Sequence, residues 1–109
     1  MKGGMYTFGE IIKSKRQKMC LLQSDVAVKL GIDAPLLSKI EKGLRRLKRE
    51  QIPKIASILN ADKEDLLTHW LADQIYDVIK DEEFGSEAIR ITGEKILCKS
   101  KAKTKFHHG

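Results

Sequence analysis

The side chains best suited to chemistry in this chain are cations gathered in its first half. Residues 1–50 hold twelve Lys and Arg against five Asp and Glu, residues 51–94 hold four against ten, and residues 95–109 hold five Lys and no acid. The densest basic run is Arg45-Arg46-Leu47-Lys48-Arg49. A basic half of this kind favours a polyanionic partner such as nucleic acid. A solvated charged surface is the alternative, and charge alone does not choose between the two.

Residue types that act as nucleophiles, general bases or metal ligands are few. The histidines are His69, His107 and His108, and none of them stands at metal-ligand spacing from a cysteine or carboxylate motif. No phosphate loop, Gly-x-Ser-x-Gly or His-Glu-x-x-His is present. Cys20 and Cys98 form no Cys-x-x-Cys pair, and we expect both thiols to be free, with Cys20 buried and Cys98 exposed. The sequence therefore predicts no enzyme active site, no cofactor and no metal.

Length and composition bound the class of protein. The chain has 109 residues, of which 41% are hydrophobic and 33% charged, which is typical of one globular domain with a tail. No apolar run approaches the ~18 residues that a membrane span needs. Residues 1–6 carry no apolar stretch behind their single lysine, unlike a secretory signal. We expect a cytoplasmic protein with no membrane contact.

Apolar residues recur at intervals of three and four and predict helices along most of the chain. An amphipathic helix is expected from Phe8 to about Met19, and a further one over residues 52–59. Pro53 either lies in the first turn of that helix or kinks it. A long helix is expected from about Lys63 to Lys80, and residues 84–97 carry a weaker helical pattern. No long stretch alternates at period two, so the fold is predicted to be all-α.

Between these helices, the sequence predicts two short ones joined by a glycine turn. Residues 23–30 form the first and stop at Gly31, because glycine enters the left-handed region without steric cost. The second begins after Asp33, whose carboxylate can cap it, and Pro35 stands in its first turn. Gly43 ends it after about two turns. Such a pair is a helix-turn-helix unit, whose second helix fits a DNA major groove about 12 Å wide.

The same region resembles a known family. The resemblance is to the Cro/phage-repressor-type helix-turn-helix regulators, also called the xenobiotic-response-element (XRE) family. It is carried by Gln23-x-x-Val26-Ala27-x-x-Leu30-Gly31-Ile32 and Leu37-Ser38-Lys39-Ile40-Glu41-x-Gly43, with Lys54-Ile55-Ala56-x-x-Leu59 similar to the family's fourth helix. It covers roughly Phe8 to Leu67. It implies an all-α, five-helix, lambda-repressor-like domain that binds operator DNA, usually as a symmetric dimer.

The resemblance also implies which side chains face DNA. Ala34 and Pro35 depart from the family's polar base readers and can only pack on thymine methyl groups, whereas Lys39 can bond guanine. Leu22 stands where the family has a capping Ser or Thr. The basic run after Gly43 is expected to contact phosphates, with one arginine reaching a base. The predicted DNA-binding residues are Gln23, Ser24, Ala34, Pro35, Leu36, Ser38, Lys39, Lys42, Arg45, Arg46, Lys48 and Arg49.

The chain continues beyond the region of resemblance with an apolar stripe from Leu66 to Ile79. Part of the stripe must pack on the domain's own core, but it is longer than such a domain covers, so we expect a two-fold dimer interface. The predicted interface residues are Leu67, Trp70, Leu71, Ile75, Val78 and Ile79. The predicted domains are residues 1–67 for DNA binding, 68–98 as a helical extension for dimerisation, and 99–109 as a flexible basic tail.

These observations favour a sequence-specific regulator that binds double-stranded operator DNA. A repressor and a restriction–modification controller both fit, and a homodimer would match a pseudo-palindromic operator. An antitoxin-like protein-interaction module that also binds DNA is the alternative, in which the acidic half holds a basic protein partner encoded nearby. Non-specific nucleic-acid binding through the lysine tail is a third interpretation.

Overall fold

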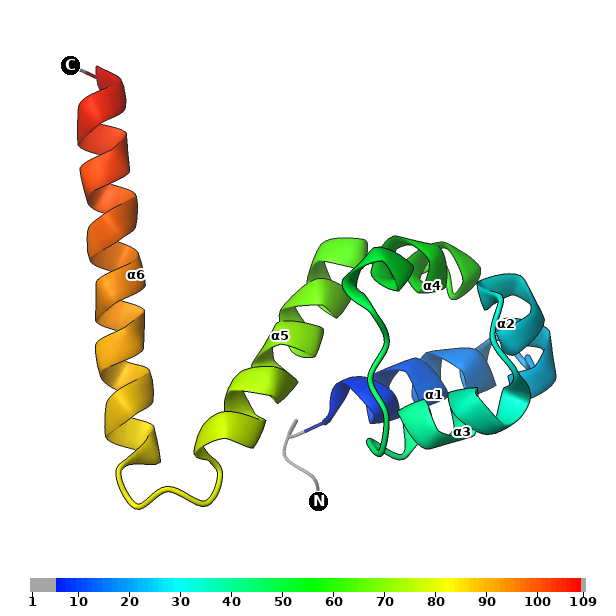
Figure 1. The fold of residues 1–109 in the computed structure, drawn as a ribbon. Helices are drawn as coiled ribbons and strands as arrows, with labels where there is room; N and C mark the ends of the chain where they lie inside the picture. Colours follow the sequence, from blue (N-terminus) through cyan, green and yellow to red (C-terminus); the bar gives the residue numbers. More distant parts are fainter. Residues whose placement is uncertain (1–5, 109) are drawn as a thin grey trace. The chain divides into compact units, whose positions relative to one another are not determined.

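The computed structural model describes the backbone of residues 6–108 and the side chains of residues 6–100 (Figure 1). Its elements are α1 (Phe8–Lys18), α2 (Gln23–Leu30), α3 (Ala34–Glu41), the single 3-10 turn η1 (Arg49–Gln51), α4 (Ile52–Ile58), α5 (Lys63–Ile79) and α6 (Gly85–His108). Residues 6–108 contain no strand. The predicted all-α fold, with five helices and a helical C-terminal extension, is confirmed.

Local capping bonds explain where the helices begin. The hydroxyl of Thr7 accepts the backbone N–H of Glu10 at 3.1 Å, and the Glu10 carboxylate accepts that of Thr7 at 3.0 Å. Asp33 caps α3 by accepting from the N–H of Leu36 at 2.8 Å. Leu22 has no side-chain acceptor to cap α2, and there the Asp25 carboxylate accepts the Leu22 N–H at 2.8 Å. The first turns of all three helices are thus stabilised.

Pro53 is accommodated without a kink. Since α4 begins at Ile52, the proline lies in the first turn, where its missing N–H breaks no helical bond. The turn η1 precedes it and holds residues 49–51, which a longer helix would otherwise have included. Of the two positions that the sequence left open for this proline, the structure has the one in the first turn.

The core of the N-terminal unit, Met1–Gln74, is built from one face of each of its helices. The largest fully buried side chains are Ile12, Leu37, Ile52, Ile55, Leu66 and Val26. Gly9 lets α1 and α3 lie close together (Figure 1), because a Cβ there would stand only 2.4 Å from the carbonyl oxygen of Ile40. This contact fixes α3 on α1.

The boundary of this unit lies inside α5, after Gln74. The unit includes the first part of α5 because Leu67 and Trp70 pack against its core and the Asp73 carboxylate accepts the backbone N–H of Phe8 at 2.9 Å. The division at residue 67 into a DNA-binding domain and a dimerisation extension stays a prediction. The C-terminal unit, Ile75–Gly109, contains the end of α5, a turn and α6.

One expectation needs correction. Cys20 is exposed rather than buried, because it takes the left-handed conformation (φ 59°) that ends α1, and Leu21 packs against the core in its place. The backbone of residues 99–108 continues α6. They contain no glycine or proline to stop the helix, and lysine and alanine favour it. The flexibility of residues 99–109 stays a prediction. Cys98 is exposed and both thiols are free, as expected.

Candidate nucleic-acid interface

A buried ion pair orients the helix-turn-helix unit. Arg16 of α1 and Glu41 at the end of α3 are both almost inaccessible to solvent. The Arg16 Nε donates to Glu41 Oε2 at 2.7 Å, and Nη2 donates to Oε1 at 3.1 Å. A third guanidinium bond runs from Nη1 to the Leu21 carbonyl at 2.8 Å. These guanidinium bonds tie the end of α3 to α1 and to Leu21 in the α1–α2 connection.

Gln23, at the first position of α2, joins the same network. Its Nε2 donates to Glu41 Oε1 at 3.0 Å, and the side chain is half-buried. The sequence predicted a DNA contact for this residue. In the structure its amide is already held by Glu41, so its orientation is fixed by the network. Ser24 beside it is exposed.

The predicted readers on α3 differ in exposure. Pro35, Lys39 and Lys42 are exposed. Ala34 and Leu36 are half-buried and pack against the core, which leaves them less surface for a ligand than the sequence suggested. Ser38 is also half-buried. The exposed chemistry of this surface is therefore dominated by Lys39 of α3 and by Lys42, the residue that caps its C-terminal end.

The basic run after α3 is held at its centre. The Leu47 side chain is buried in the core, and its carbonyl accepts the indole Nε1–H of Trp70 at 2.8 Å. The side chains on either side of Leu47 are exposed; they are Arg45, Arg46, Lys48 and Arg49. We call these four residues the basic loop. Its backbone path is set by Leu47, so the cations share one short, fixed segment that follows α3.

Trp70 thus contributes to this surface in a way that the sequence did not indicate. It was assigned with Leu67 to a dimer interface, and both side chains pack at least partly on the unit's own core. Of the remaining residues of that predicted interface, Leu71, Ile75 and Val78 are exposed and Ile79 is half-buried. The apolar surface left on α5 therefore begins at Leu71.

The Arg16–Glu41 pair was also missed, although the spacing carried a signal. Arg16 lies four residues after Ile12, and Glu41 four residues after Leu37, so each charge continues the buried face of its helix. A cation and an anion on two buried faces are expected to pair, because an isolated buried charge is costly.

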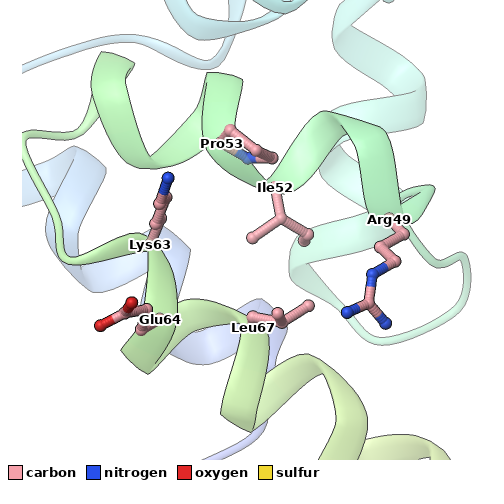
Figure 2. Close-up of a pocket in the computed structure, with 6 residues that line it drawn as sticks. All are labelled: Arg49, Ile52, Pro53, Lys63, Glu64 and Leu67. Atoms are coloured by element: carbon pink, nitrogen blue, oxygen red, sulfur yellow. The ribbon is translucent and has the colours of Figure 1, made fainter.

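The hollow drawn in Figure 2 has a volume of about 320 Å³ and opens between the start of α4 and the start of α5. Apolar Ile52, Pro53 and Leu67 line it, with Arg49, Lys63 and Glu64 at its sides. In the described part of the chain, no group of three or more His, Cys, Asp or Glu could hold a metal ion.

Two short helices at a fixed angle, with an exposed lysine face and an adjoining basic loop, define a helix-turn-helix DNA-binding fold. A family model described as Helix-turn-helix matches residues 12–66, half of the chain. The chain belongs to this Cro/phage-repressor-type, or XRE, family of DNA-binding transcription regulators. Neither the search of curated proteins nor that of solved structures found a match. Within the described residues, no helix has the length and apolar character needed to cross a membrane.

Proposed function

We propose that this chain is a sequence-specific transcriptional regulator of the repressor or restriction–modification controller type. It binds a pseudo-palindromic operator in double-stranded DNA as a homodimer, in the cytoplasm. The proposal rests on one observation, which is that two neighbouring cationic segments, α3 and the basic loop, are each held in place by buried contacts. The buried ion pair to Arg16 orients α3, and Leu47 anchors the basic loop that follows it.

The two segments have different roles in this proposal. Lys39, exposed in the last turn of α3, reads a guanine edge in the major groove, and Pro35 packs on a thymine methyl group. Ser38 and Lys42 support this contact, and Ala34 and Leu36 contribute only their exposed edges. The basic loop, with Ser24 and Gln23 at the start of α2, binds phosphates and sets the register of the protein on the duplex.

The dimer is proposed to form through the apolar surface that α5 leaves exposed. Leu71 and Ile75 continue at helical spacing into Val78, which is 75% exposed. A two-fold pairing of these residues buries them and presents two copies of α3 to one face of the duplex. The half-sites of the operator are then expected about 10 base pairs apart, or a multiple of that spacing.

Selection of bound sequences from a random duplex library, at physiological salt, tests the proposal. We expect a two-fold symmetric motif with half-sites about one helical turn apart. A motif without symmetry would contradict the dimeric mode. Recovery of no motif would contradict sequence-specific binding altogether.

Two alanine variants separate base reading from phosphate binding on the selected operator. Lys39→Ala should relax the preference at one base pair by about 1–3 kcal/mol. Arg46→Ala should weaken all sequences alike and reduce the log–log salt slope by about 1. Lys80→Ala is the matched control, because it removes the same charge from an ion pair with Asp77, in an acidic segment. Unchanged operator affinity in both test variants would contradict the assigned surface.

An antitoxin-like role is the second candidate. It is favoured by the exposed apolar side chains of the C-terminal unit, such as Val78 and Phe84, within the acidic stretch of residues 51–94. A basic protein encoded by a neighbouring gene would be the partner. Co-expression with each adjacent reading frame should then give a stoichiometric complex that survives at high salt. Free chain in every case would contradict this role.

A further inference from the structure

The helix α6 has one strongly polar side, which ion pairs along the helix occupy. Arg90 donates through Nη2 to Glu87 at 2.9 Å and through Nη1 to Glu94 at 2.7 Å. These three residues, at spacings of three and four, lie on the same side of the helix. Their charges satisfy one another at the surface, so this side needs no protein partner.

The opposite side of α6 carries two exposed isoleucines and a threonine whose hydroxyl is bonded within the helix. Ile89, Thr92 and Ile96 follow each other at spacings of three and four, and we call them the α6 stripe. Ile89 is 40% exposed and Ile96 is 66% exposed. The hydroxyl of Thr92 donates to the Ala88 carbonyl at 2.8 Å, so it can be buried without losing a hydrogen bond. The stripe therefore has the chemistry of a contact surface.

Gly93 stands beside the centre of the stripe, where this chain gives no reason for a glycine. A Cβ at Gly93 would meet nothing within 4 Å, whereas one at Gly9 would clash with α3. A glycine inside a helix costs about 1 kcal/mol relative to alanine. Close approach of another backbone is the physical reason that accounts for such a residue. A second helix crossing α6 at Gly93 would supply that backbone.

The distribution of charge along the chain indicates which helix packs on α6 at Gly93 and in which direction that helix runs. Residues 81–87 include Asp81, Glu82, Glu83 and Glu87 and no cation, and residues 95–105 hold five Lys and no acid. The centre of the stripe, between Thr92 and Gly93, lies about eight residues from the middle of each block. Two parallel α6 helices would place the basic blocks together and repel each other. Two antiparallel helices direct each basic block toward the N-terminal end of the other α6, where Glu87 and the acidic turn of residues 81–83 lie.

We propose that a second copy of this chain packs its α6 antiparallel on the α6 stripe, with Ile89 of each copy opposite Ile96 of the other and Gly93 at the crossing. The inference deepens the proposed homodimer and rests on it for the second copy. It gives that dimer a contact in addition to α5, and the charge pattern rather than the apolar stripe decides its direction.

Charge exchange in the full-length chain, measured by sedimentation without DNA, tests the direction. One variant reverses the basic block by Lys99→Glu, Lys101→Glu and Lys103→Glu, and another reverses the acidic block by Asp81→Lys, Glu82→Lys and Glu83→Lys. Each is expected to raise the dimer Kd by about tenfold or more at low salt. The chain with all six substitutions should return to within about threefold of the original Kd.

A matched control separates local pairing from net charge. Lys13→Glu, Lys18→Glu and Lys29→Glu change the net charge as the first variant does, at exposed positions of α1 and α2. This control should leave the Kd within about threefold. The proposal is overturned if the chain with all six substitutions does not regain the original dimer Kd. It is also overturned if the control and the two block variants all give the same Kd.

Crosslinking tests the register independently. In a chain carrying Cys20→Ser and Cys98→Ser, Ile96→Cys should not form a disulfide with its own copy, because the two positions lie at opposite ends of the contact. Mixed with a chain carrying Ile89→Cys, it should form the 89–96 disulfide under mild oxidation. Self-crosslinking of Ile96→Cys, or no 89–96 product, would overturn the register. Neither measurement uses DNA. Failure of the α6 pairing is therefore distinguishable from failure of sequence-specific DNA binding, which the library selection measures.

Discussion

The Arg16–Glu41 pair makes a sharp prediction for the stability of the N-terminal unit. Glu41 accepts three hydrogen bonds, two from Arg16 and one from Gln23, at 2.7–3.1 Å. Glu41→Ala leaves the buried guanidinium without its counter-charge, which costs about 3–5 kcal/mol. Since small domains are stable by about 5–15 kcal/mol, this is a large share of the total. At about 4–8 °C per kcal/mol, the Tm should fall by about 12–40 °C.

Thermal unfolding followed by far-UV circular dichroism measures this loss. Urea unfolding followed by the fluorescence of Trp70, the one tryptophan, gives the free energy of unfolding of the same unit. Asp65→Ala is the control, because Asp65 pairs with His69 at 3.7 Å on the exposed surface of α5. Its effect should stay within about 0.5–1 kcal/mol.

A double-mutant cycle identifies the cause of the loss. Arg16→Met alone leaves Glu41 buried as an unpaired anion, and we expect a loss similar to that of Glu41→Leu alone. The double variant removes both charges and should be more stable than either single variant, because apolar replacement of a buried pair is close to neutral. A loss below about 1 kcal/mol for Glu41→Ala, or additive losses in the double variant, would refute the reasoning.

Three further substitutions test the packing around the interface. Gly9→Ala should destabilise the unit by about 1–3 kcal/mol, because the new Cβ meets backbone oxygens that cannot move aside. This loss is expected although alanine favours the helix more than glycine does. An unchanged Tm would contradict the close approach of α1 and α3. Trp70→Phe removes the bond to the Leu47 carbonyl and should cost about 1 kcal/mol, measured by urea unfolding followed by far-UV circular dichroism because the variant has no tryptophan. It should also weaken binding to all DNA sequences, and loss of preference at one base only would argue against it. Asp33→Ala should cost about 1 kcal/mol through loss of the α3 cap, measured by the midpoint of urea unfolding, and equal midpoints would exclude a role for this cap.

Local signals made most of the helices predictable from the sequence. Residues 23–30 formed the expected helix, and Gly31 takes the left-handed conformation (φ 79°) that the stop required. Asp33 caps α3 as expected, and α5 differs from its predicted range by one residue. Each of these features depends on backbone bonds that span only a few residues, so the sequence around the position contains the cause.

The candidate site was predictable only in part. The motif spanning Gln23 to Gly43 indicated the family, which the family model confirms, and it indicated the helix that carries Lys39. It did not indicate that Ala34 and Leu36 would pack against the core. Which side of a two-turn helix is partly buried depends on the angle at which that helix packs on its neighbours. Nor did it indicate that Gln23 would be held by a carboxylate eighteen residues away.

By itself, the sequence determined the helix type of most segments, the family and the division of charge into basic and acidic blocks. The tertiary structure alone decided that Trp70 supports the basic loop, that Arg16 and Glu41 meet, and that Cys20 faces solvent. The physical reason is range. Caps, turns and helix periods are set by neighbours within about four residues, whereas burial and long-range bonds depend on which helices cross and how closely their backbones approach.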